Sequence, residues 1–357
     1  MSTVILLGLL AMFFAYISKF NHFRWGLKFS FFLIFLFLAL RYNYGNDYTS
    51  YLSGFIKINS YNKVDYFDKY YVVEPGWILL NRIFRPFGFF AMIAVLALFN
   101  CVIYYLLIKK YVPVKYYWIA IFLYVFTPGF MLTHISAMRQ SVSIALFLFS
   151  LDFLYRRAPI RYFAIIIVAS FIHTSAMILL PVYLLTYAKW RINKVTIAVI
   201  VALFLLIFIF GKVISPVLYQ FVRDFFERYE PYLEVGALNT GFGAVYFSSL
   251  LLLTLYYEQF QDKETALIFK VAIIGFLFIP LSLLIELIGR VGMYFTPATI
   301  IVYPIIFMKM KSKITKTFFL SFLFTMVLIL FFAFFESEVW REGYASYQTV
   351  FSSPRYY

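Results

Sequence analysis

Apolar runs long enough to cross the hydrocarbon core of a membrane recur along the whole chain. They lie near residues 3–18, 29–41, 86–108, 116–130, 134–155, 195–211, 242–257, 265–287, 291–308 and 316–335. A helix crosses a core of ~30 Å with about 20 residues. The runs are continuously apolar, which excludes the alternating pattern of a transmembrane β-barrel. The sequence therefore predicts an all-α, polytopic integral membrane protein.

The stretch 160–187 departs from this pattern because basic clusters flank it on both sides: Arg156, Arg157 and Arg161, then Lys189, Arg191 and Lys194. A single span would place these clusters on opposite sides of the membrane. Two half-spans, or two short spans, place both in the cytoplasm, with a break at His173-Thr174-Ser175. Broken helices persist at membrane depth where they line a cavity. We expect a broken or re-entrant pair near 160–187, and about 10–13 transmembrane helices in all.

The charges sort unequally between the two sides. With the N-terminus outside, 18 basic and four acidic residues face the cytoplasm (+14), and the remaining 13 basic and 12 acidic residues face outward (+1). An excess of Lys and Arg marks cytoplasmic loops, so the net charge of +15 predicts membrane orientation and not nucleic-acid binding. The outer segments are then 41–85, 212–241 and the tail 336–357. No linker or low-complexity tract divides the chain, so residues 1–357 are expected to form one transmembrane domain in the cytoplasmic (inner) membrane.

The outer loop 41–85 has the pattern of interfacial helices. Asn46 or Asp47 is suited to cap a short helix with tyrosines and other apolar residues on one face. Glu74-Pro75 is typical of an N-cap followed by proline in the first helical position. The following helix carries Trp77, Leu80, Phe84 and Phe87 at helical spacing, which is typical of a helix lying in the membrane interface.

Six ionisable residues lie at or near the outer ends of the spans: Arg41, Asp47, Glu74, Arg139, His173 and Arg290. A charge at membrane depth needs a partner or a function. Guanidinium groups match phosphate oxygens bidentately, so the three arginines are candidates for binding a diphosphate. Glu74, Asp47 and His173 are candidate proton acceptors, and Glu74 ranks first among them.

Each of these residues also has a purely structural interpretation. Arg139 can form an internal ion pair with Glu74 or Glu286, and Arg290 can pair with Glu286. Arg41 can extend to the interface and pair with Asp47. Glu74 can serve only as an N-cap, and His173 can merely cap the helix break. The sequence leaves these alternatives open.

Several kinds of site are missing from the sequence. It contains no phosphate-binding Gly-rich loop with Lys, no Gly-x-Ser-x-Gly elbow, no Asp-x-Asp pair and no Cys/His cluster with metal-ligand spacing. We therefore expect no metal and no cofactor. Aromatic and polar residues near the outer side are candidates for glycan binding: Tyr48, Tyr51, Trp77, Gln140 and Tyr294. An interfacial aromatic belt is the alternative for the tyrosines.

Four motifs in order resemble the EpsG-type exopolysaccharide polymerases, relatives of the Wzy O-antigen polymerases. They are Arg41…Gly45-Asn46-Asp47-Tyr48…Tyr51, Glu74-Pro75-Gly76-Trp77…Leu80, Ser136-Ala137-Met138-Arg139-Gln140-Ser141-Val142 and Phe171-Ile172-His173-Thr174-Ser175-Ala176. The resemblance covers roughly residues 41–181. Arg290…Tyr294 and the tail around Tyr344–Phe351 extend it loosely.

The resemblance implies a glycosyltransferase that joins oligosaccharide repeat units carried on undecaprenyl diphosphate, on the outer face of the membrane. It implies a metal-independent, inverting transfer, with arginines at the leaving diphosphate and a carboxylate or histidine as base. The implied partners are the lipid-linked oligosaccharide, the bilayer, and a chain-length regulator or other pathway proteins. Two alternatives stay open: an O-antigen ligase, and a flippase or transporter of the lipid-linked glycan. A flippase needs a polar path to the cytoplasmic face, and the inner halves of the spans hold little polar content.

Overall fold

The structure, a computed structural model, describes residues 1–60, 73–187, 193–225, 242–282 and 286–352. Parts of all three predicted outer segments lie outside the described residues: 61–72, 226–241 and 353–357. The chain divides into two units, Met1–Tyr183 with Met310–Tyr357, and Leu184–Lys309. A single domain over residues 1–357 stays a prediction.

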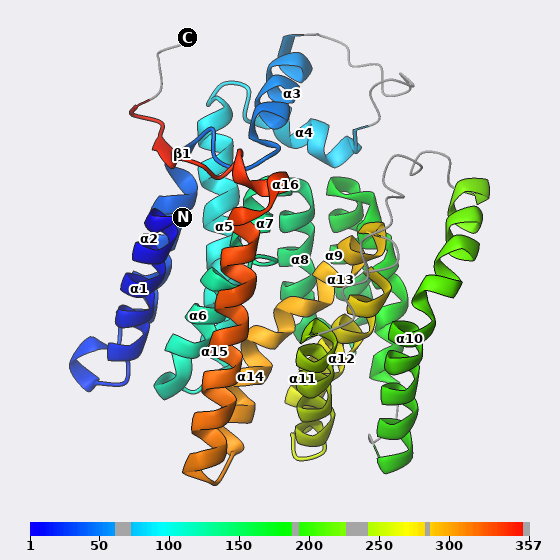
Figure 1. The fold of residues 1–357 in the computed structure, drawn as a ribbon. Helices are drawn as coiled ribbons and strands as arrows, with labels where there is room; N and C mark the ends of the chain where they lie inside the picture. Colours follow the sequence, from blue (N-terminus) through cyan, green and yellow to red (C-terminus); the bar gives the residue numbers. More distant parts are fainter. Residues whose placement is uncertain (61–72, 188–192, 226–241, 283–285, 353–357) are drawn as a thin grey trace. The chain divides into compact units, whose positions relative to one another are not determined.

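The first unit is a bundle of apolar helices with short elements at one end (Figure 1). Its elements are α1 (Ser2–Ile17), η1 (Asn21–Phe23), α2 (Gly26–Ala39), β1 (Arg41–Tyr42), α3 (Tyr48–Ser60), α4 (Pro75–Ile83), α5 (Phe89–Tyr111), η2 (Val114–Tyr116), α6 (Tyr117–Phe126), α7 (Met131–Ser136), α8 (Met138–Tyr155), α9 (Pro159–Ile172), the first part of η3 (Thr174–Thr186), α15 (Lys313–Glu336), α16 (Glu338–Arg341) and β2 (Gln348–Thr349).

The second unit is also helical. Its elements are α10 (Lys194–Phe225), α11 (Phe242–Glu258), α12 (Lys263–Ser282), α13 (Glu286–Phe295), η5 (Thr296–Ala298) and α14 (Thr299–Lys309). Helix α12 packs against α10, α11, α13 and α14. An ion pair of 3.6 Å between Lys270 Nζ and Glu258 Oε1 joins α12 to α11.

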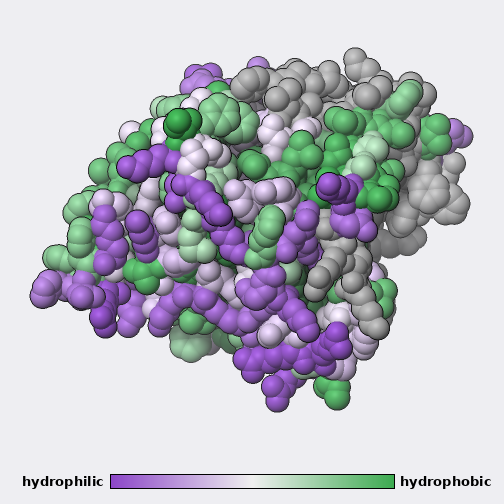
Figure 2. Space-filling model, turned by 90° about the horizontal axis from the view of Figure 1, so that it is seen from below, coloured by the Kyte–Doolittle hydropathy of each residue, from purple (hydrophilic) through white to green (hydrophobic). Residues whose placement is uncertain are grey.

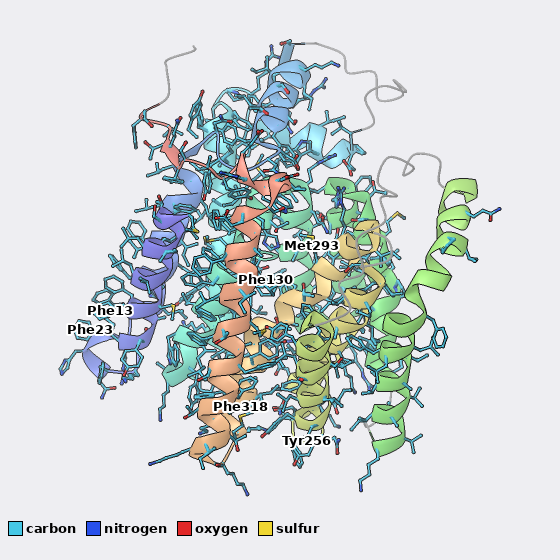
Figure 3. All side chains as sticks on the ribbon, viewed as in Figure 1. Phe13, Phe23, Phe130, Tyr256, Met293 and Phe318 are labelled. Carbon is cyan, nitrogen blue, oxygen red and sulfur yellow. The ribbon has the colours of Figure 1, made fainter. Side chains whose placement is uncertain are left out.

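Within the described residues, five helical segments are long and apolar enough to cross a membrane: Asn21–Ala39, Phe89–Tyr111, Lys263–Ser282, Ile288–Lys309 and Lys313–Glu336. Shorter apolar helices accompany them, including Ser2–Ile17, Val114–Phe126 and Pro159–Ile172. Large apolar side chains also cover the periphery: Phe13 and Phe23 are more than 40% exposed and lie at the outer edge of the first unit (Figure 3). The predicted all-α, multi-pass membrane architecture is confirmed.

The two ends of the first unit differ in character. Elements α3, α4, α16 and the β1–β2 pair gather at the upper end in Figure 1, while the α1–α2 turn and the start of α15 lie at the lower end. Hydrophilic side chains gather over part of the face seen from below, next to hydrophobic ones (Figure 2). In this unit the basic residues of the lower turns and helix ends are Lys19, Arg24, Lys28, Lys109, Lys110, Lys115, Arg156, Arg157, Arg161, Lys311, Lys313 and Lys316.

Helix boundaries follow the predicted spans closely, with three notable outcomes. Helix α9 ends at Ile172, His173 has extended backbone angles (φ −149°, ψ 110°) and η3 begins at Thr174, so the predicted break is in place. The predicted span 134–155 is wrong at its start, because Ala137 (φ −95°, ψ 60°) separates α7 from α8. Helix α10 continues beyond the predicted end at residue 211 into the segment expected to lie outside.

Candidate functional site

Glu74 lies at the centre of a cluster built from three separate parts of the chain. Its Oε2 accepts a hydrogen bond of 2.5 Å from Arg139 Nη1 on α8. Its Oε1 accepts a bond of 3.2 Å from His173 Nδ1 and one of 3.3 Å from the Thr174 N–H, both at the α9–η3 break. Arg139 and His173, which the sequence nominated for separate reasons, therefore share the carboxylate of Glu74.

Local backbone features produce this meeting point. Glu74 occupies the N-cap position of α4, with Pro75 in the first turn as predicted, but its side chain makes no capping bond. The interruption at Ala137 places Arg139 in the first turn of α8, where the helix dipole disfavours a cation. The carboxylate of Glu74 offsets that cost, so the ion pair predicted as an alternative for Arg139 is present.

The close approach of α4 to α9 depends on Gly76. A Cβ added at Gly76 would lie 2.7 Å from the backbone oxygen of Phe171 and 2.8 Å from its carbonyl carbon. Only a residue without a side chain allows the start of α4 to reach the end of α9. Because Glu74 and His173 lie two residues beyond these contact points, the glycine sets their separation.

The cluster is half-buried but reachable from one end of the unit. The side chains of Glu74, His173 and Arg139 are 14%, 19% and 31% exposed. Burial acts to raise the pKa of Glu74, but the hydrogen bond from His173 and the positive charge of Arg139 outweigh it and lower this pKa to about 2. Glu74 is therefore an ionised hydrogen-bond acceptor at neutral pH.

An aromatic wall borders the cluster. Tyr51 on α3 makes a side-chain hydrogen bond to Arg139, and its ring meets the ring of Trp77 edge-on at 5.5 Å between centroids. Trp77 is 4% exposed and belongs to a core cluster with Tyr48 and Phe89. Tyr51 is the half-buried member of this group and lies nearest to the charged residues. Tyr48, at 2% exposure, contributes to the site through packing.

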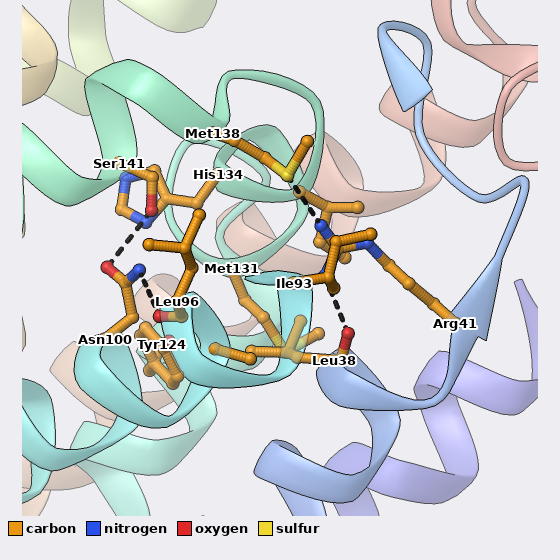
Figure 4. Close-up of a pocket in the computed structure, with 12 residues that line it drawn as sticks. Leu38, Arg41, Ile93, Leu96, Asn100, Tyr124, Met131, His134, Met138 and Ser141 are labelled. Carbon is orange, nitrogen blue, oxygen red and sulfur yellow. Dashed lines mark hydrogen bonds between the residues drawn. The ribbon is translucent and has the colours of Figure 1, made fainter. Parts of the chain in front are cut away.

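Arg41 is turned into the interior of the first unit (Figure 4). It is 4% exposed and donates to the Leu38 carbonyl at 2.7 Å, with its Nη2 3.2 Å from Met138 Sδ. These groups line a cavity of about 30 Å³ that also contains His134. Within the described part of the chain, Arg41 Nε and both ring nitrogens of His134 have no hydrogen-bond partner. Burial lowers the pKa of Arg41 to about 10, which leaves it charged at pH 7.

The remaining predicted site residues are more widely distributed. Asp47 is exposed and precedes α3, where its carbonyl accepts the Tyr51 N–H. Gln140 is 4% exposed in the first turn of α8. Arg290 is exposed and Tyr294 is fully buried, both in α13 of the second unit.

Sequence reasoning missed the network that fixes the loop containing Asp47. Tyr344, in the tail, donates a hydrogen bond to the Leu132 carbonyl, and its hydroxyl lies 3.0 Å from Ser136 Oγ. Ser136 Oγ in turn accepts the Asn46 N–H at 2.8 Å. The β1–β2 pairing, Arg41 with Thr349 and Tyr42 with Gln348, continues the connection. The polar Ser136 was the available signal, but nothing in the sequence links it to the tail.

Within the described ranges, no group of three or more His, Cys, Asp or Glu side chains is arranged to hold a metal ion. Comparison with known families gives one match: the model of the EpsG family matches residues 24–349. No curated protein and no solved structure matches the chain.

Proposed function

The chain belongs to the EpsG family, and on that premise we propose that it is a polymerase that joins undecaprenyl-diphosphate-linked oligosaccharide repeat units into a surface polysaccharide. Family membership and the apolar helices support a function in polysaccharide biosynthesis at a membrane. The observation that carries the finer proposal is the convergence of Glu74, Arg139 and His173 at one end of the first unit. Their combination of an oriented imidazole and a guanidinium suits glycosyl transfer from a diphosphate.

The reaction is a single displacement at the anomeric carbon of the donor glycan. A hydroxyl oxygen of the acceptor repeat unit forms the new bond to that carbon. The bond from the carbon to the diphosphate oxygen breaks, and undecaprenyl diphosphate leaves with the electron pair. The hydroxyl proton passes to a base of the protein. One displacement inverts the configuration at the anomeric carbon.

The geometry favours His173 over Glu74 as the proton acceptor. A carboxylate with a pKa of about 2 is a weak base at neutral pH, because effective general bases have pKa values near the operating pH. The ionised Glu74 accepts the Nδ1–H of His173, so Nε2 is the ring nitrogen proposed to take the proton. Glu74 then orients the imidazole and stabilises its protonated form, as the carboxylate does in a Ser-His-Asp triad. Asp47 is the next candidate.

Arg139 is the proposed partner of the leaving diphosphate. A guanidinium carries five N–H donors, and bonds to Glu74 and Tyr51 occupy only part of them. Donors fixed in advance at the position where negative charge develops lower the barrier of the transfer. Tyr51 is the proposed glycan-binding residue of this cluster, because the side chains of Tyr48, Trp77 and Gln140 are buried. Arg41 and Arg290 as phosphate partners, and Tyr294 as a glycan contact, stay predictions from the sequence.

We place this site on the outer side of the cytoplasmic membrane. The support is the charge asymmetry, since the basic turns of the first unit lie at the end opposite α3 and α4. The positive-inside rule assigns that basic end to the cytoplasm. Lipid-linked repeat units would then reach the cluster from the outer leaflet.

Purified protein given lipid-linked repeat units in detergent tests the proposal. Wild type should form a ladder of polymer in excess chelator. His173→Asn should slow elongation by about 10²–10⁴-fold, while His22→Asn, at an exposed histidine of the other end, should not. Polymer at the wild-type rate from His173→Asn would refute the assigned base. Wild type that translocates lipid-linked glycan across vesicles without elongating it would indicate a flippase, and transfer to a different acceptor would indicate a ligase.

A further inference from the structure

A groove runs between α5 and α8 at the basic end of the first unit, away from the Glu74 cluster. It has a volume of about 280 Å³ and apolar walls that include Leu106, Leu148 and Phe149. One water needs only ~15 Å³ of such space, so the groove has room for a chain-like ligand. Leu106 and Phe149 are 47% and 45% exposed, which opens the groove toward the surrounding hydrocarbon.

The polar end of this groove carries three charges held in a fixed arrangement. Lys110 Nζ lies 2.7 Å from Asp152 Oδ1, and Arg156 Nε lies 2.9 Å from Asp152 Oδ2. All three residues line the groove. Two cations share one carboxylate, so the group has a net charge of +1. The side chains of Lys110 and Arg156 are 42% and 63% exposed, so both reach the surface at the groove's end.

The groove lies at the far end of the same helices that build the candidate active site. Phe89, at the start of α5, packs on Tyr48 and Phe55 of α3, whereas Lys110 is in the last turn of α5. A rise of ~1.5 Å per residue separates these positions by ~32 Å. The groove is therefore a separate site and does not depend on the proposed polymerase activity.

We propose that the α5–α8 groove binds an anionic phospholipid, with its phosphate at Lys110 and Arg156 and an acyl chain along the apolar walls. Charge complementarity selects this occupant, because basic pockets between transmembrane helices bind anionic headgroups at the cytoplasmic side. Asp152 holds the two cations at the groove and at the same time weakens their attraction for phosphate. A neutral zwitterionic lipid would gain the apolar contacts without the charge contribution.

Native mass spectrometry of the full-length protein in detergent tests this proposal, with phosphatidylglycerol and phosphatidylcholine of identical chains as probes. Wild type should retain phosphatidylglycerol about five-fold more strongly, since one basic residue near an anionic surface contributes roughly 1 kcal/mol. Lys110→Ala and Arg156→Ala should each reduce that preference. Asp152→Asn should increase it, because two cations then face the phosphate alone. Lys115→Ala, at an exposed lysine of the same end outside the groove, should leave it unchanged.

A second pair of variants tests the apolar half of the site. Leu106→Trp fills the groove and should weaken phosphatidylglycerol retention at unchanged charge. Leu98→Trp places the same ring on an exposed position of α5 outside the groove and should have no effect. Equal retention of the two lipids would overturn the proposal. So would charge variants whose preference for phosphatidylglycerol changes in a direction other than the one stated. Displacement of the lipid by millimolar inorganic phosphate would overturn it as well.

Discussion

At the residue scale, Glu74 decides the geometry of the candidate site. Its position before Pro75 suggested a helix cap, yet its two oxygens bond instead to Arg139, His173 and the Thr174 N–H. The N-cap position therefore places Glu74 at the start of α4, and its contacts with Arg139 and His173 determine what its carboxylate does. A carboxylate that fixes both a guanidinium and an imidazole coordinates the two groups that the proposed reaction needs.

Glu74→Gln should lower stability by about 1–3 kcal/mol at pH 7, because it leaves the half-buried Arg139 without its counter-charge. Glu74→Asp should lose polymer elongation, since the shorter side chain cannot bring its carboxylate to both Arg139 and His173. Glu338→Gln, in the exposed start of α16, is the control. Thermal unfolding in detergent measures the stability change, and a Glu74→Gln protein as stable as wild type would show that the ion pair contributes nothing.

The same residue gives a pH dependence with a defined sign. The pKa of Glu74 falls from an ordinary value of 4.5 to about 2 in the folded protein. A group with a lowered folded-state pKa stabilises the fold above the unfolded pKa, and this contribution is lost as the pH falls through the folded pKa. The difference in unfolding temperature between wild type and Glu74→Gln should have its largest value above pH 4.5 and should decrease as the pH falls toward 2. A difference that grows on acidification would contradict the assignment.

At the element scale, the site depends on the contact between α4 and α9. Gly76→Ala should push the two helices apart, because the new Cβ meets the backbone of Phe171 at 2.7 Å. Overpacking of this kind costs about 1–3 kcal/mol, and separation of Glu74 from His173 should reduce elongation as well. Gly129→Ala is the matched control, since a Cβ there has nothing within 4 Å. Activity assays on both variants check the prediction, which fails if Gly76→Ala and Gly129→Ala behave alike.

The tail is the second element on which the site depends. Tyr344→Phe removes the hydroxyl that bonds to Leu132 and Ser136 and leaves a buried carbonyl without that partner. We expect a loss of about 1–3 kcal/mol and faster hydrogen exchange in the β1–β2 pair. Tyr155→Phe, at a residue 43% exposed, should change neither. Unaltered exchange in Tyr344→Phe would mean that the tail is held by its ring contacts alone.

Elements that depend on local pattern could be predicted, and those that depend on tertiary contacts could not. The apolar runs predicted the helices, and the basic clusters on both sides of 160–187 predicted the break at His173. The break at Ala137 has no such signal, because Ala favours helix and the interruption comes from packing around Ser136. For the same reason the sequence left Arg139 with two possible carboxylate partners, and the tertiary structure pairs it with Glu74.

At the scale of the whole molecule, the first unit combines two chemically different ends. One end holds the ionised cluster around Glu74, and the other holds the basic turns and the α5–α8 groove. Helices α5 and α8 reach both ends, so the membrane thickness separates the proposed chemistry from the proposed lipid site. The charge pattern along the sequence predicts the basic end, because the positive-inside rule needs no tertiary information.

The orientation of the first unit in the membrane can be tested at the two ends of α15. In a Cys101→Ser background, single cysteines at Lys313 and Ser346 flank α15, and both positions are exposed. Cys101 itself is buried in α5, and serine is close to cysteine in volume, so the replacement should leave the packing there nearly unchanged. Ser346→Cys should react with an impermeant thiol reagent in intact cells, because the positive-inside rule places the Tyr344-containing tail outside. Lys313→Cys should react only after the membrane is permeabilised. The reverse pattern would place Glu74, Arg139 and His173 in the cytoplasm and exclude polymerisation on the outer face.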